Sequence, residues 1–203
     1  MIDEKVMKVI QDIMKRRRSI RRFKRDTFPI EKLYSILKAG LLAPSGADQS
    51  PYILIIINKE PLKRQIRAEC ETADKGFHEE SPDWLKDWFT KKNITSEKQF
   101  LTDAPFLVVI AGNTTMPYWL ESTWISVAYI ILATEEEGLA TLTYTPGQMK
   151  FLIPILDLPE VYEPVVILPI GYPDESPTKI NNDDKETKIF FNKFGVERNP
   201  SCS

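Results

Sequence analysis

A cluster of positive side chains near the N-terminus is the first feature of this chain that could do chemistry. Eight of the eleven residues from Lys15 to Arg25 are Lys or Arg, and Ser19 adds a hydroxyl. Guanidinium groups present planar donors that match a phosphate. The same cluster could be a solvated helix end, where cations interact with the helix dipole, or a nucleic-acid patch. The residues alone leave all three open, although a formal net charge of −2 gives no reason to expect nucleic acid as the main partner.

Two short segments could place a flat ligand against the main chain. The first, Ala43 to Ala47, reads APSGA and supplies small side chains before a predicted strand. Such a loop lets a ligand approach the backbone closely, although it could equally be an ordinary helix-to-strand turn. The second, Thr143 to Thr145, carries two hydroxyls at the end of another predicted strand. Threonine is common in strands, so this segment could also be a plain strand end that stops at Pro146.

A charged and aromatic stretch from about residue 66 to 101 is the third candidate region. Asp74 and His78 are four residues apart, which places them on one face of a helix, and Lys98 follows later. His78 is the only histidine and could titrate near neutrality. These groups could bind substrate or could be solvated surface charges. Four aromatic residues could line an aromatic-accepting pocket or only pack this stretch onto the body: Trp84, Trp88, Phe89 and Phe100.

Helices and buried strands that alternate along the chain must position these groups. Apolar spacing predicts helices over about 3–16, from Pro29 to near Ala43, from Pro61, over 122–137 and over 147–156. Apolar runs predict strands over 52–57, 106–111, 139–144 and 165–170. This alternation favours a sheet with helices on both faces, and 203 residues suit one domain.

Taken in order, these motifs resemble the nitroreductase family, and most closely its iodotyrosine deiodinase-like branch. The resemblance rests on RRRSIRRF at 16–23, on APSGA followed by Pro51-Tyr52, on TLTYTP at 141–146 and on Gly171-Tyr172-Pro173. It implies an α+β fold with a central mixed β-sheet flanked by helices on both faces. It also implies one domain over residues 1–203 that forms an intertwined homodimer, with a lid over about 66–101 and a C-terminal extension over about 174–203.

The resemblance further implies an FMN site and a substrate site. The phosphate and ribityl chain of FMN would be held by Arg17, Arg18, Ser19, Ile20 and Arg21. Pro44, Ser45 and Gly46 would pack against the flavin, often from the partner subunit, and Lys185 would reach the phosphate. Thr143, Tyr144 and Thr145 would lie along the flavin, with Thr143 and Thr145 as catalytic donors near N5. Substrate contacts would come from Ala47, Asp74, His78 and Lys98.

The expected function is therefore that of an FMN-dependent enzyme that uses NAD(P)H to reduce flat aromatic, nitro or quinone-type acceptors. A reductive dehalogenase of halotyrosine-like substrates and a flavin-binding protein without turnover are the alternatives, and a nucleic-acid-binding protein is a further rival. No GxGxxG fingerprint of a dedicated nicotinamide domain occurs. We expect no metal site, no membrane span and a cytoplasmic location, because the two cysteines are far apart and no signal peptide is evident.

Overall fold

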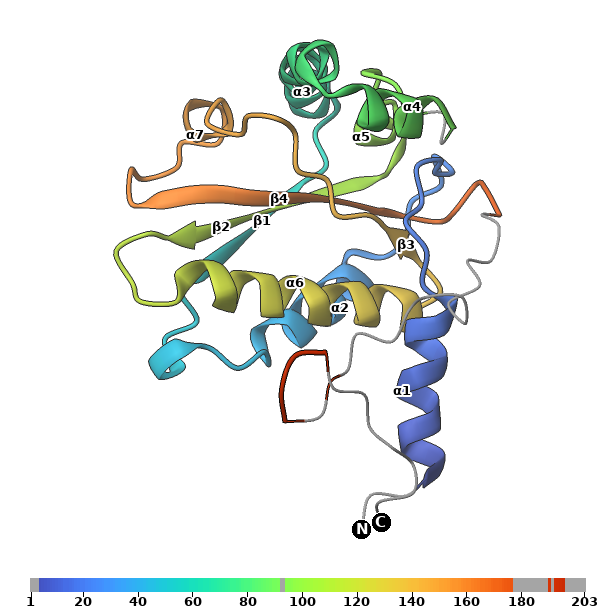
Figure 1. Cartoon of the computed structure of the whole chain (residues 1–203), viewed down its shortest axis with the longest axis vertical. Coiled ribbons are helices and arrows are strands. Elements are labelled where there is room, and N and C mark those ends of the chain that lie inside the picture. Colours follow the sequence, from blue (N-terminus) through green and yellow to red (C-terminus); the bar gives the residue numbers. More distant parts are fainter. Residues whose placement is uncertain (1–3, 92–93, 177–189, 191, 196–203) are drawn as a thin grey trace.

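A computed structural model describes residues 4–91, 94–176, 190 and 192–195 of the chain (Figure 1). Helices and strands alternate along it as the sequence predicts. The helices are α1 (Glu4–Arg16), α2 (Ile30–Leu41), α3 (Glu60–Glu80), α4 (Asp83–Lys91), α5 (Phe100–Asp103), α6 (Trp119–Glu136) and α7 (Leu152–Ile155). The strands are β1 (Tyr52–Ile57), β2 (Phe106–Asn113), β3 (Ala140–Thr141) and β4 (Tyr162–Gly171), and a short 3-10 turn covers Gly46–Asp48.

The four strands form one sheet in the order β1-β2-β4-β3. Every pair of neighbours is antiparallel: Ile57 faces Leu107, Phe106 faces Ile170 and Ala140 faces Gly171. The expectation of a mixed sheet is therefore wrong for these four strands. Among the described residues, parallel pairing occurs at an isolated bridge between Ser19 and Thr141, outside the regular strand pairs. The connections through α3–α5 and through α7 double back, so the strands that they join are antiparallel, whereas the connection through α6 joins β2 to β3, which are not neighbours in the sheet. The chain that runs through α3, α4 and α5 begins β2 beside the end of β1, where Ile57 faces Leu107.

Helices cover both faces of the sheet, as the resemblance implies. Figure 1 shows α3, α4, α5 and α7 on one side and α2 and α6 on the other. Successive residues of a strand point to opposite faces, and β2 follows this rule. Leu107 and Val109 join the core under α3, whereas Phe106, Val108 and Ile110 join the core under α6. Burial on both faces explains why the strand sequences are continuously apolar.

Two of the predicted elements are shorter in the structure. The strand expected over 139–144 is regular only at β3, and the helix expected over 147–156 is regular only at α7. Tyr144 still pairs with Ile167 through two backbone hydrogen bonds of 2.9 and 3.1 Å, so the segment stays beside β4 without forming a continuous ladder. Leu142 to Thr145 and Gly147 line a cavity where the chain leaves the ladder.

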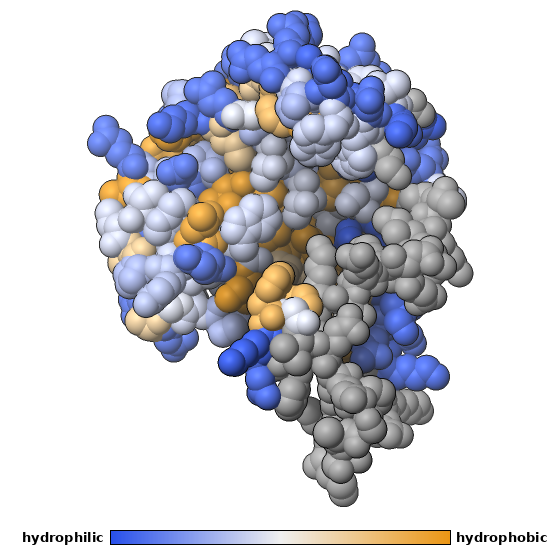
Figure 2. Space-filling view, viewed as in Figure 1, coloured by the Kyte–Doolittle hydropathy of each residue, from blue (hydrophilic) through white to orange (hydrophobic). Residues whose placement is uncertain are grey.

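On the face drawn in Figure 2, the surface is polar along the top, where α3, α4 and α5 lie, and apolar in the middle. Figure 2 shows hydrophilic side chains along the upper edge and hydrophobic side chains gathered in the middle of the same face. Within the described ranges no helix is both long enough and apolar enough to span a bilayer.

Candidate functional site

A cavity of about 700 Å³ lies between the lid and the segment that follows β3. The N-terminal basic cluster contributes to one side of it, and α3 and α4 contribute to another. Its lining includes Ser19, Arg21, Arg22, Asp74, Phe77, His78, Trp88, Phe89, Ile94, Thr95, Glu97, Lys98, Gln99, Phe100, Leu142, Thr143, Tyr144, Thr145, Gly147 and Glu175. Segments that are far apart in sequence thus meet at one place, as a site that holds both FMN and a substrate would require.

A second cavity of about 400 Å³ shares part of this lining. Ser19, Leu142 and Thr143 line both cavities, and Arg17 lines the second one together with residues of α6. A ligand with a phosphate-bearing chain and a flat ring could therefore extend along the 142–145 segment. An extended ligand could reach both Arg21 in the first cavity and Arg17 in the second.

The 142–145 segment alternates between the core and the cavities. Leu142 and Tyr144 are buried in the core cluster, whereas Thr143 and Thr145 are exposed. Alternation follows from extended backbone, in which successive side chains point to opposite sides. Both threonine hydroxyls are therefore available to a ligand, as expected for donors along a flavin.

The basic cluster divides into residues that line the cavities and residues that do not. Arg17, Ser19 and Arg21 line them. The guanidinium of Arg18 instead donates to the carbonyl oxygens of Lys15 (2.6 Å) and Arg17 (2.7 Å) at the end of α1. That is the helix-end role that the composition also allowed. Ile20 is buried in the core, and its backbone N–H donates to the Thr141 carbonyl; neither side chain lies in the cavity lining.

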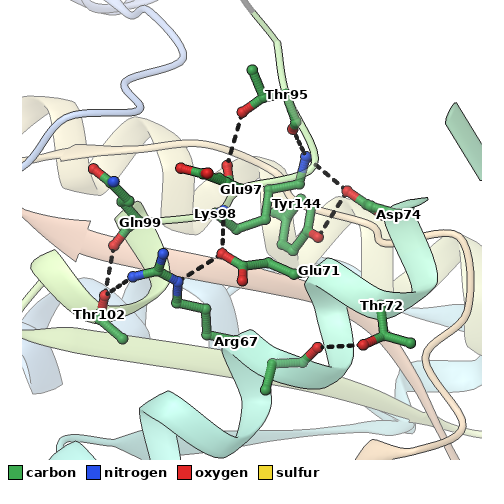
Figure 3. Close-up of polar contacts among 11 residues, drawn as sticks. Arg67, Glu71, Thr72, Asp74, Thr95, Glu97, Lys98, Gln99, Thr102 and Tyr144 are labelled. Atoms are coloured by element: carbon green, nitrogen blue, oxygen red, sulfur yellow. Dashed lines mark hydrogen bonds and ion pairs between the residues drawn. The ribbon is translucent and has the colours of Figure 1, made fainter.

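The lid residues Asp74 and Lys98 form a buried ion pair (Figure 3). Lys98 Nζ lies 2.8 Å from Asp74 Oδ2, and Asp74 and Lys98 are only 6% and 4% exposed. The Tyr144 hydroxyl donates to Asp74 Oδ2 at 3.0 Å, and the Gly147 N–H donates to Oδ1 at 3.2 Å. These residues are therefore not solvated surface charges. They line the cavity as predicted, but they bind each other.

A further carboxylate holds this arrangement from behind. Glu71 Oε1 accepts from the Lys98 N–H at 2.7 Å and lies 2.7 Å from Arg67 Nε. Glu71 and Arg67 lie one helical turn apart on α3, so their ion pair fixes the carboxylate beneath the 95–99 segment. The 95–99 segment therefore attaches to α3 through backbone as well as side-chain contacts.

His78 belongs to an aromatic wall of the cavity. Its ring stacks on Phe89 with centroids 4.3 Å apart, and Trp88 packs edge-on against Phe89. Burial lowers the pKa of His78, and the positive charge of Lys98 adds to the effect while Asp74 opposes it. Of the four lid aromatics, Trp88, Phe89 and Phe100 line the cavity, whereas Trp84 is 70% exposed on α4.

The Cys70 thiol and the Tyr144 hydroxyl are buried beside the ion pair of Asp74 and Lys98. Burial raises the pKa of the Cys70 thiol to about 12, against a smaller lowering effect of the Tyr144 hydrogen bond. Burial also raises the pKa of the Tyr144 hydroxyl, and the neighbouring Cys70 and Asp74 add to that rise. Both groups are therefore protonated at neutral pH. Tyr144 acts here as a hydrogen-bond donor to Asp74, so its side chain is not directed to a ligand.

The 44–47 loop does not reach the cavities of its own chain. Gly46 donates to Ser122 Oγ at 3.1 Å and packs on Tyr118, at the beginning of α6. The second cavity touches α6 first at Ala128, six residues beyond Ser122, which corresponds to about 9 Å along a helix. Pro44, Ser45, Gly46 and Ala47 thus lie apart from the other predicted site residues. Lys185 lies outside the described residues.

Comparison with known proteins now decides the family. The sequence profile of the "Nitroreductase family" matches residues 14–172. The chain belongs to the nitroreductase family. It is 38% identical over 188 residues to an iodotyrosine deiodinase of Thermotoga neapolitana, covering 93% of this chain and 100% of the relative.

Solved structures agree with this assignment of the family. An oxidised iodotyrosine deiodinase bound to FMN and 3-iodo-L-tyrosine superposes with a TM-score of 0.87 at 37% identity, covering 91% of this chain and 100% of that one. An FMN-dependent nitroreductase of Clostridium difficile gives 0.72 at 28% identity, covering 90% and 98%. The nitroreductase fold is thereby confirmed for this chain.

Some residues of this nitroreductase-family site escape sequence reasoning. Glu175 accepts from the backbone N–H groups of Arg21 and Arg22, and all three line the cavity. Glu97 also lines it, and Glu71 supports Lys98. No local pattern marks Glu175 or Glu71 among the many acids of the chain. Their partners lie far away in the sequence, so only the folded arrangement identifies them.

Proposed function

We propose that this protein is an FMN-dependent reductase that removes halogen from halogenated phenols of the tyrosine type. The observation that carries the proposal is similarity over the whole length of an iodotyrosine deiodinase, with 38% identity. The solved deiodinase that superposes on this chain binds FMN and 3-iodo-L-tyrosine. The cavity between an aromatic lid and a threonine-bearing segment suits the same two classes of molecule.

The donor set of this chain fits FMN. Arg17, Arg21 and Ser19 offer guanidinium and hydroxyl donors for the phosphate and ribityl chain, since they line the two cavities that share the 142–143 segment. The outward-facing hydroxyls of Thr143 and Thr145 would lie along the ring system. Bound FMN would supply the electrons for reduction of the substrate. An external donor, which we propose to be NADH or NADPH, would then reduce the flavin again.

The protein's own groups would orient substrate and exclude water. His78 and Phe89 offer stacked rings against which a flat phenol can pack. Thr143 and Thr145 would donate hydrogen bonds where charge develops as electrons and a proton pass to the substrate. The lid helices α3 and α4 cover the cavity, which strengthens those interactions by excluding solvent.

We also infer that the site is completed by a second copy of the chain. The 44–47 loop, expected against the flavin, lies away from its own cavity. Ala47, Asp48 and Ser50 have positive φ angles of 52°, 55° and 43°, which is strained for residues other than glycine. Strain of this kind is typical of functional loops. A homodimer would bring this loop to the partner's cavity.

A test of the proposed function begins with purified protein and its visible spectrum. Bound flavin, followed by release of iodide from 3-iodo-L-tyrosine or 2-iodophenol under dithionite, would support the proposal. Retained flavin with no halide release from either compound would overturn it. In that case oxidation of NADH or NADPH with a nitroaromatic or a quinone would support the second candidate, a general reductase, which similarity to an FMN-dependent nitroreductase favours.

The two threonines provide a test at single residues. Thr143→Val and Thr145→Val remove an exposed hydroxyl at nearly constant volume. We expect each change to lower the rate of substrate reduction by about tenfold, the loss equivalent to one hydrogen bond of about 1.4 kcal/mol. Stopped-flow measurement of substrate reduction by the pre-reduced holoprotein would show it. Unchanged rates in both variants would mean that neither hydroxyl contacts the reacting groups.

A further inference from the structure

We propose that this protein recognises the ring of a halogenated phenol and gains little affinity from an amino-acid head group, because the lid acid and base that could hold that head group neutralise each other. The inference rests on the proposed function and deepens it. A tyrosine-like substrate has an ammonium and a carboxylate, for which Asp74 and Lys98 are the expected partners. In this structure Asp74 and Lys98 are partners of one another (Figure 3).

The carboxylate of Asp74 already accepts from three donors within the protein. Oδ2 accepts from Lys98 Nζ at 2.8 Å and from the Tyr144 hydroxyl at 3.0 Å, and Oδ1 accepts from the Gly147 N–H at 3.2 Å. Three donors from two segments, 95–99 and 142–147, hold it toward the body. The residue is 6% exposed, so it presents almost no surface to an incoming ammonium.

The ammonium of Lys98 is equally occupied. It donates to the Thr95 carbonyl and to Asp74, and it lies 5.8 Å from the centre of the Tyr144 ring. Its backbone N–H is fixed by Glu71. With 4% of the residue exposed, the side chain cannot turn to a ligand carboxylate without leaving Asp74 buried and unpaired.

A zwitterion would therefore gain little free energy from the lid pair. It would break a buried ion pair to form two new ones, and it would have to lose the hydration of both its own charges. Other charged side chains do line the cavity, namely Arg21, Arg22, Glu97 and Glu175. Glu97 is exposed, and exposed ion pairs contribute little to affinity. Glu175 already accepts from the backbone of Arg21 and Arg22.

What remains free in the cavity suits an aromatic ring. The stacked His78 and Phe89 rings and the edge of Trp88 offer apolar surface. The hydroxyls of Thr143 and Thr145 offer polar contacts. A phenol can use all of these and carries no head group that needs desolvation, so the ring supplies most of the affinity.

The test compares two ligands on the FMN-loaded protein, 2-iodophenol and 3-iodo-L-tyrosine, by quenching of flavin fluorescence. We expect their dissociation constants to agree within about threefold, which is a small difference on the free-energy scale. Binding of 3-iodo-L-tyrosine more than about tenfold tighter would overturn the inference and leave the proposed function intact. Failure of flavin-loaded protein to bind either ligand would overturn both.

A variant tests the cause. Asp74→Asn keeps an acceptor for Tyr144 but removes the charge that neutralises Lys98. We expect it to tighten binding of 3-(4-hydroxy-3-iodophenyl)propionate, relative to 2-iodophenol, by about fivefold or more, because Lys98 becomes available to the carboxylate. Asp87→Asn, which makes the same charge change at an exposed position of α4, should leave that ratio unchanged. An unchanged ratio in Asp74→Asn overturns the inference; should that variant not fold, the comparison of ligands on the unaltered protein still decides.

Discussion

At the scale of single residues, the environment of a side chain decides what its chemistry can do. Asp74 belongs by sequence to a run of acids that could all be solvated, yet it is buried against Lys98 and Tyr144. A buried ion pair adds little net stability as a pair, because desolvation of both charges opposes their attraction. Removal of one partner is costly, because the other charge stays buried.

Asp74→Ala should therefore destabilise the protein strongly. We expect a loss of about 3–5 kcal/mol in the free energy of unfolding, since Lys98 would remain buried without its counter-charge. Urea unfolding followed by circular dichroism would measure the loss. Asp87→Ala, at an exposed position of α4, should change stability by less than about 0.5 kcal/mol. Similar losses in both variants would contradict the burial of the pair.

Cys70 gives a second test at this scale. The thiolate is the reactive form, and burial raises the pKa of this thiol to about 12, so at pH 8 it is protonated and shielded. In a Cys202→Ser background we expect no reaction with a disulfide reagent in the native state and one equivalent after denaturation. Rapid labelling of native protein would show that the region beneath α3 opens readily.

At the scale of elements, helix α6 buries small polar side chains together with apolar ones. Its buried side chains include Ser122, Thr123 and Ser126, whereas Trp124 and Ile125 are among its exposed ones. Small inward residues let neighbouring elements approach closely. At the crossing with α2, a Cβ built on Gly40 would lie 2.5 Å from the fully buried Ile130. Close packing of α2 and α6 therefore depends on the absence of a side chain at Gly40.

Gly40→Ala and Gly76→Ala should shift stability in opposite directions. Alanine favours helix over glycine by about 0.5–1 kcal/mol, and Gly76 in α3 has open space for a Cβ. Gly76→Ala should therefore stabilise by about that amount. Gly40→Ala should destabilise by about 1–2 kcal/mol, because overpacking against Ile130 exceeds the helix gain. Thermal unfolding of both variants would measure the two signs, and a rise in melting temperature for Gly40→Ala would contradict the tight crossing.

At the scale of the whole molecule, the outward face of α6 is large and apolar. Leu120, Trp124, Ile125 and Tyr129 are each more than a third exposed. Contiguous exposed apolar side chains mark an interaction surface more often than they mark free surface. Together with the remote 44–47 loop, this face supports the proposed homodimer.

A matched pair of tryptophans tests the dimer. Trp124→Glu places a charge on the α6 face and should convert the protein to monomers, because burying an unpaired charge at an interface is costly. Trp84→Glu, at the 70% exposed tryptophan of α4, should leave the mass unchanged. Sedimentation equilibrium would report both masses. If Trp124→Glu also remains dimeric, the interface lies on another face.

The sequence by itself determined the order of the main elements and the family. Strands β1, β2 and β4 follow from continuous apolar runs, because a strand buried on both faces needs no polar alternation. The family follows from motifs at Arg17–Arg21, Thr143–Thr145 and Gly171–Pro173 in the right order. The resemblance proposed Asp74, His78 and Lys98 as substrate contacts, and all three line the cavity.

Only the tertiary structure decided how those groups are used. Antiparallel pairing of the sheet, the helix-end role of Arg18 and the ion pair between Asp74 and Lys98 all depend on distances between segments remote in sequence. Periodicity reports which face of an element is buried, but not which neighbour meets it. A carboxylate and an ammonium placed within 3 Å of each other in a buried site bind one another, and no pattern along the chain encodes that distance.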